Sequence, residues 1–152
     1  MEDLMNFDGQ FAVITGSSNG IGAEAAKKIT SLGGRVTINY SKSLQAAEEV
    51  AHECSRVGKP PLVLRADVST DDGCKSLIDK AVKEFKSLHI LINNAGRTKF
   101  AKHSDLDALI REDFENIFSL NLISNYELVK YAKTHLAKNK KSSIVNISSV
   151  AG

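Results

Sequence analysis

The sequence is poor in residues that mark several classes of protein. Its 152 residues include 2 cysteines, 2 prolines and no tryptophan. Two cysteines cannot hold together a chain of this length, which excludes a disulfide scaffold and favours a reducing compartment, the cytoplasm. No apolar run approaches the roughly 18 residues that a membrane-spanning helix needs. Residues 1–10 are acidic and polar, unlike a secretory signal, so we expect neither membrane insertion nor secretion.

An excess of charge of one sign is also missing. Lys and Arg total 20 and Asp and Glu total 18, which leaves a formal net charge of +2. This balance gives no indication of a nucleic-acid partner or an anionic membrane. The cysteines and the 4 histidines lack the spacing of metal ligands, so no metal site is expected. A content of 42% hydrophobic and 25% charged residues is typical of one globular domain.

What the chain does contain is an alternation of apolar runs and helical patterns. The runs are rich in Val and Ile and predict strands buried on both faces. Apolar residues at helical spacing predict the helices between them, the last being one long helix. The alternation implies right-handed crossovers and a three-layer α/β fold with a doubly wound parallel sheet. The expected strands are Phe11–Ile14, Arg35–Asn39, Leu62–Leu64, Ile90–Ile92 and Ile144–Ile147, and the expected helices Gly22–Leu32, Leu44–Arg56, Asp71–Phe85 and Arg111–Lys138.

A glycine-rich turn separates the first strand from the first helix. Small residues allow a tight turn and a close approach of the backbone to a pyrophosphate, and the helix start offers unpaired N–H groups to it. The position between a buried strand and a helix is much stronger support for a dinucleotide site than the glycines alone. The turn is Thr15-Gly16-Ser17-Ser18-Asn19-Gly20-Ile21-Gly22.

The spacing of these glycines resembles the classical branch of the short-chain dehydrogenase/reductase family. Four further segments, in order along the chain, resemble motifs of the same family. The resemblance runs from about Phe7 to Gly152 and implies a Rossmann-like fold that binds a nicotinamide dinucleotide. The further segments are Asp67-Val68, Asn93-Asn94-Ala95-Gly96, Asn121 in the long helix and Ile144–Ser149.

The end of the second strand indicates which cofactor is bound. An acidic residue about 20 positions after the glycines binds the ribose 2′-hydroxyl of NAD, and none is present here. Ser41, Lys42 and Ser43 can donate hydrogen bonds instead, which favours NADP(H) over NAD(H). Lys42 fits a solvated lysine at a helix start equally well. Family members that bind NADP often have a basic residue where this chain has Asn19.

The family resemblance also implies catalytic residues. Ser149 matches the serine that orients and polarises the substrate oxygen, and Asn121 matches the asparagine of the proton relay. The family's Tyr-x-x-x-Lys pair would come about a dozen residues after the serine. Tyr126 and Lys130 have that spacing but precede the serine, so we interpret them as neighbours on a helix surface.

We therefore expect residues 1–152 to form a single, incomplete dinucleotide-binding domain, truncated at its C-terminal side. In complete form it would interconvert a small alcohol and a carbonyl compound, and a homo-oligomer is expected. The chain itself is expected to bind cofactor imperfectly and to lack enzymic rates of reduction, with its last strand left as an exposed apolar edge. The alternative hypothesis is a dinucleotide-binding or interaction module without catalysis.

Overall fold

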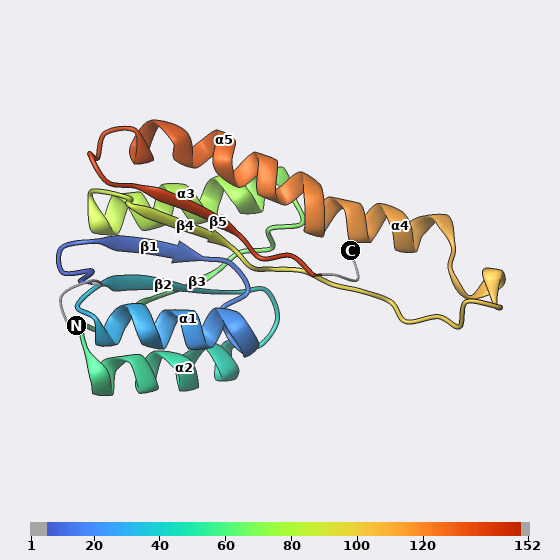
Figure 1. Cartoon of the computed structure of the whole chain (residues 1–152), viewed down its shortest axis with the longest axis horizontal. Helices are drawn as coiled ribbons and strands as arrows, with labels where there is room; N and C mark the ends of the chain where they lie inside the picture. The colour runs from blue at the N-terminus through green and yellow to red at the C-terminus, as the bar shows by residue number, and fades with distance from the viewer. Residues whose placement is uncertain (1–5, 150–152) are drawn as a thin grey trace.

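A five-stranded parallel sheet forms the centre of the computed structural model, which describes residues 6–149 (Figure 1). The strand order is β3-β2-β1-β4-β5, so the chain reverses its direction of winding between β1 and β4. This is the doubly wound topology predicted from the sequence. The strands are β1 (Phe11–Ile14), β2 (Arg35–Tyr40), β3 (Leu62–Arg65), β4 (Ile90–Asn93) and β5 (Ser143–Asn146).

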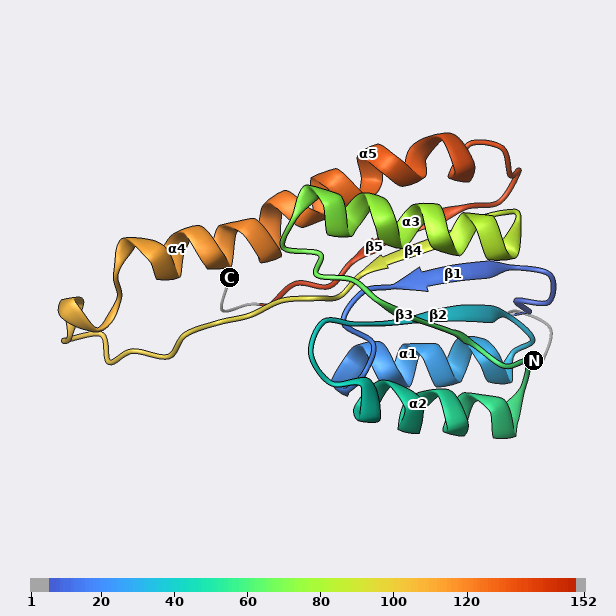
Figure 2. The same ribbon diagram turned by 180° about the vertical axis from the view of Figure 1, so that it is seen from behind.

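Two helical layers cover the sheet. Helices α1 (Gly20–Ser31) and α2 (Leu44–Val57) cover one face, and α3 (Asp71–Phe85) and α5 (Ser124–Leu136) cover the other (Figures 1 and 2). Successive strand residues point to opposite faces. Ile14 therefore packs in the core on the α1 side, whereas its neighbour Val13 packs in the core against α3 and α5. Both faces are apolar for this reason, which confirms the predicted three-layer architecture.

The long helix predicted over Arg111–Lys138 runs from Arg111 to Leu136, but it is not α-helical throughout. Helix α4 (Arg111–Phe118) is followed by a π-helical turn, η2 (Ser119–Ile123), before α5 begins. The wider turn changes the backbone hydrogen bonding, and the Ser124 N–H donates to the Ser119 carbonyl five residues earlier. Side chains satisfy two nearby carbonyls: the Ser124 hydroxyl donates to Leu120 and the Asn125 amide to Asn121.

The π turn separates two parts of the chain with different environments. Helix α5 lies on the sheet, while α4 extends away from it together with residues 97–110 (Figure 1). Leu128 in α5 is fully buried, but Phe114 and Phe118 in α4 are 52% and 54% exposed. The short 3-10 helix η1 (Leu106–Ala108) lies within residues 97–110.

Strand β5 forms one edge of the described sheet. It pairs with β4 alone, and Ile144 and Val145 keep 45% and 41% of their surface exposed. The sheet face beside Val145 borders a cavity of about 410 Å³ that Ile90 and Ile92 also line. The expectation of an exposed apolar edge therefore agrees with the arrangement of the described residues.

His89, just before β4, links this strand to β1. Its Nδ1 atom accepts a hydrogen bond of 3.2 Å from the Phe11 N–H, and its ring lies 5.6 Å from the Phe11 ring. Burial lowers the pKa of the imidazole below its usual value near 6.5. The neutral form is therefore favoured in the folded protein, because a protonated Nδ1 cannot accept this bond.

We predict that acid weakens the fold through His89. As the pH falls, His89 is protonated in the unfolded chain at a higher pH than in the folded protein. The stabilisation that neutral His89 gives to the folded state is therefore complete above about pH 6.5 and is lost as the pH falls through the lowered folded pKa. Urea unfolding at a series of pH values should show the free energy of unfolding decreasing over this interval. His89→Asn keeps an acceptor without titrating and should flatten the profile, whereas an equal decrease in both proteins would contradict the assignment.

Candidate functional site

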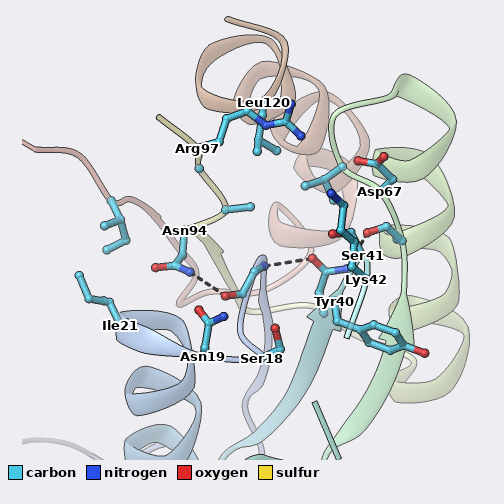
Figure 3. Close-up of a pocket in the computed structure, with 17 residues that line it drawn as sticks. Ser18, Asn19, Ile21, Tyr40, Ser41, Lys42, Asp67, Asn94, Arg97 and Leu120 are labelled. Atoms are coloured by element: carbon cyan, nitrogen blue, oxygen red, sulfur yellow. Dashed lines mark hydrogen bonds between the residues drawn. The ribbon is translucent and has the colours of Figure 1, made fainter. Parts of the chain in front are cut away.

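A cleft of about 430 Å³ lies at the carboxyl ends of the parallel strands, where the winding reverses between β1 and β4 (Figure 3). Open α/β sheets bind ligands at this position. The walls come from the glycine-rich turn, the ends of β2, β3 and β4, the π turn and the residue after β5. The lining residues are Gly16, Ser18, Asn19, Ile21, Asn39, Tyr40, Ser41, Lys42, Ala66, Asp67, Val68, Asn94, Ala95, Gly96, Arg97, Leu120 and Ile147.

The glycine-rich turn fits tightly against the segment after β4. Gly16 has φ +60°, and a Cβ atom on it would lie 2.9 Å from the Ala95 Cα atom. A Cβ atom on Gly22 would lie 2.5 Å from the Asn94 amide nitrogen. Glycine is therefore required at both positions by close backbone approach, and at Gly16 also by the backbone conformation.

The start of α1 keeps its N–H groups available. The side chain of Asn19, at the N-cap position, makes no capping hydrogen bond. By contrast, Ser43 caps α2 and Thr70 caps α3 with their side-chain oxygens. Because first-turn N–H groups lack partners within the helix, an uncapped helix start facing a cleft suits an anionic group. Figure 3 shows Ser18, Asn19 and Ile21 at this wall.

Ser17 lies beneath the cleft rather than in its wall. It is fully buried, and its hydroxyl donates to the Ile14 carbonyl at 2.8 Å and accepts from the Asn39 N–H at 2.9 Å. The Asn39 side chain continues the network by accepting from the Gly16 N–H at 3.1 Å and donating to the Ala66 carbonyl at 3.1 Å. Asn39 therefore connects the glycine-rich turn to the end of β3. Sequence reasoning missed it, although an amide inside an apolar strand was a usable signal.

Asn94 holds the opposite wall against the same turn. Its side-chain amide donates to the carbonyls of Thr15 and Gly16 at 2.9 and 3.1 Å. The Thr15 hydroxyl oxygen in turn accepts from the N–H groups of Asn94 and Ala95, both at 3.0 Å. Thr15 was not predicted as a site residue, yet it fixes the distance between the turn and β4. Ala95 and Gly96 line the cleft beside Asn94.

Charged groups stand at the rim of the cleft. The N–H and hydroxyl of Ser69 donate to the Asp67 carboxylate, and with the positive charges of Arg97 and Lys42 they hold the pKa of Asp67 below its usual range. Asp67 is therefore ionised at neutral pH. Figure 3 shows it on the same side of the cleft as Tyr40, Ser41 and Lys42. The neighbouring Val68 is largely buried but also contributes to the lining.

Asn121 and Ser149 lie outside the set of residues that line the cleft. The Asn121 amide accepts from the Arg97 N–H and donates to the Arg97 carbonyl, both at 2.9 Å, and so fixes the main chain of a cleft residue. Ser149 is exposed and follows the end of β5. Lys130, set aside as a catalytic group, contacts Asp71 at 3.1 Å on the surface between α5 and α3.

Comparison with known proteins gives the class of this site. The family model described as short chain dehydrogenase matches residues 10–152, and the chain belongs to that family. A short chain dehydrogenase of Claviceps purpurea is 36% identical over 142 residues, which are 93% of this chain and 52% of that protein. The trihydroxynaphthalene reductase PfmaI of Pestalotiopsis fici is 32% identical over 131 residues, 86% of this chain and 45% of that protein.

Solved structures of short-chain dehydrogenases have the same fold as this chain. A short chain dehydrogenase from Burkholderia cenocepacia in complex with NADP has a TM-score of 0.89 and 29% identity, over 96% of this chain and 58% of that one. A metagenomic short-chain oxidoreductase in complex with NADP has a TM-score of 0.87 and 28% identity, over 95% of this chain and 64% of that one. The chain spans about half the length of the curated relatives it matches.

Within residues 6–149, no helix is long and apolar enough to cross a membrane. The same part of the chain holds no group of three or more His, Cys, Asp or Glu side chains that could bind a metal ion.

We predict that Gly16→Ala destabilises the protein by about 2 to 4 kcal/mol, because it combines a left-handed conformation with a contact that the backbone of Ala95 cannot relieve. Gly9→Ala is the matched control: Gly9 has φ +73° with open space beside it. That change should cost only about 1 kcal/mol. Urea unfolding measures both values, and equal losses would show that the tight approach at Gly16 contributes nothing.

Proposed function

We propose that the chain is the cofactor-binding part of an NADP(H)-dependent oxidoreductase that interconverts alcohol and carbonyl groups. The observation that carries the proposal is the composition of the cleft. A glycine-rich turn and an uncapped helix start lie at one wall, and Lys42 lies in the loop after β2, where it makes no direct ion pair within residues 6–149. Two of the structural relatives were solved with NADP, which supports the same choice.

The residues around the cleft fit the parts of such a dinucleotide. The turn from Gly16 to Gly22 and the start of α1 would hold the pyrophosphate through backbone N–H groups. Asp67 and Val68 would contact the adenine, and Ser41 and Lys42 the 2′-phosphate. Asn94, Ala95 and Gly96 form the wall nearest β4. When bound, the nicotinamide supplies or accepts the hydride.

Two further residues would act on the substrate side. The Ser149 hydroxyl would donate to the oxygen of a small carbonyl compound and so polarise it. Asn121 would belong to the proton relay, but its amide is already used by the Arg97 main chain. Its main-chain carbonyl accepts from the Asn125 amide at 3.0 Å and has a second lone pair for a water molecule.

We also propose a cytoplasmic location. Cys54 and Cys74 are both buried free thiols, and burial raises the pKa of Cys74 to about 12. The neutral thiol is inert toward oxidation, so nothing about these residues requires an oxidising compartment.

The cofactor preference can be tested by titrating the chain with NADPH and NADH. We predict tighter binding of NADPH. Lys42→Glu should weaken NADPH binding by about tenfold or more, since only NADPH brings a phosphate to this residue, and should leave NADH binding unchanged or stronger, because a carboxylate here can accept from the ribose 2′-hydroxyl. Lys28→Glu makes the same change of net charge on the exposed surface of α1 and should leave both affinities unchanged. Tighter binding of NADH by the unmodified chain would refute the preference.

We further propose that the complete protein forms a homo-oligomer, with the exposed apolar side chains of α4 in the interface. Phe114 and Phe118 lie one helical turn apart and are both about half exposed. Sedimentation velocity should show self-association that Phe114→Glu reduces. Leu44→Glu, at a residue of α2 that is 47% exposed, is the control and should have no effect. A monomer at all concentrations would contradict a contribution from α4 in this chain.

A further inference from the structure

Arg65, the last residue of β3, lies beside the loop that carries Lys42. The register of the sheet pairs Arg65 with Tyr40, the last residue of β2. The Arg65 Nε atom donates a hydrogen bond of 3.3 Å to the main-chain carbonyl of Ser41. Sheet pairing and this bond together bring a guanidinium group to the loop between β2 and α2, where sequence reasoning had considered only Ser41, Lys42 and Ser43.

The two cations at this loop are Arg65 and Lys42. Within residues 6–149, neither Arg65 nor Lys42 belongs to an ion pair. Both side chains are exposed, so water hydrates their charges, and Lys42 also interacts at longer range with the Asp67 carboxylate. The contrast is with Arg35, which lies 3.9 Å from a Glu84 oxygen and covers the Phe85 ring. Arg35 has a structural role, whereas Arg65 makes one hydrogen bond to the main chain of Ser41 and no ion pair within the described residues.

We propose that Arg65 is a specificity-determining residue that binds the 2′-phosphate of the cofactor together with Lys42; the proposal rests on the NADP(H)-dependent function proposed above. Arg65 does not itself line the cleft, but Ser41 and Lys42 do, and the bond to Ser41 holds the guanidinium next to the loop that carries them. Its Nε atom is occupied by that bond, which leaves the two terminal nitrogens to donate.

The chemistry of the group matches that of the ligand. A phosphate monoester carries close to two negative charges at neutral pH and accepts several hydrogen bonds. A planar guanidinium donates two parallel bonds to such a group, and a lysine ammonium adds a compact charge beside it. The 2′-hydroxyl of NAD(H) offers neither the charge nor the acceptors, so the contribution of Arg65 is expected only for NADP(H).

A structural role of Arg65 would leave a different signature. If the hydrogen bond to Ser41 only kept the loop in place, removing it would weaken every ligand that touches the loop, with or without the phosphate. A pair of ligands that differ in the 2′-phosphate alone therefore separates the two roles. Adenosine 2′,5′-bisphosphate and adenosine 5′-monophosphate are such a pair, and NADPH and NADH are a second.

The experiment is isothermal titration of the 152-residue chain and its variants with both pairs of ligands. Arg65→Gln removes the charge and should weaken adenosine 2′,5′-bisphosphate and NADPH by about tenfold or more, with adenosine 5′-monophosphate and NADH changed less than about twofold. Arg65→Lys keeps the charge without the planar group and should recover part of the loss. Arg56→Gln removes an exposed arginine near the end of α2 and should change nothing.

Three other results would overturn the proposal. Equal weakening of both members of each pair would assign Arg65 to positioning of the loop, and unchanged binding throughout would remove it from the site, in both cases with the proposed function intact. Failure of the unmodified chain to bind any of the four ligands would refute the proposed function, and the role of Arg65 with it. Unchanged thermal unfolding of the variants verifies that they are folded.

Discussion

A buried polar atom without a hydrogen-bond partner costs free energy, and avoiding this cost shapes the arrangement at the carboxyl ends of β1 and β2. Ser17 and Asn39 are both almost completely inaccessible to water. The Ser17 hydroxyl bonds the main chain of Ile14 and Asn39. The Asn39 side chain bonds the main chain of Gly16 in the turn and of Ala66 after β3. Since each bond fixes two backbone segments at once, the glycine-rich turn has one geometry before any ligand arrives. The cleft is therefore preorganised by interactions that lie below it, out of contact with the ligand.

Preorganisation has a further consequence for the wall at β4. The Thr15 hydroxyl oxygen accepts hydrogen bonds from two backbone N–H groups there, and the Asn94 side-chain amide donates two hydrogen bonds to carbonyls of the turn. With close backbone contact at Gly16, the two walls cannot move apart independently. Binding of a dinucleotide that bridges the two walls would therefore cost little free energy for ordering the protein. A low ordering cost favours tight binding in an open cleft.

Much of this fold could be predicted from the sequence, because its strands are buried on both faces and its helices lie between them. Strand β1 and helix α3 have the same bounds that the apolar run and the helical spacing predicted. The glycine-rich turn was evident from local pattern, and so was its place at a strand end. Periodicity could not reveal the π turn, because one additional residue per turn changes the direction of a helix without changing which residues are apolar.

The roles of individual residues were harder to predict, since a motif gives a residue's position but not the direction of its side chain. Ser17 lies within the expected phosphate-binding turn, yet its hydroxyl points into the protein. Arg65 lies in no motif, and only the pairing of β3 with β2 brings it to the loop after β2. Contacts between segments distant in sequence decide both cases, and a single sequence contains no direct record of them.

The two hydrogen bonds between Asn121 and the main chain of Arg97 close a long excursion of the chain. Residues 97–110 and α4 leave the body of the protein and return to nearly the same point (Figure 2). The entropic cost of closing a loop grows only slowly with its length. Insertions or deletions within this excursion can therefore accumulate during evolution without altering the sheet or the cleft. The chain in this way separates a region free to diversify from one that must keep its geometry.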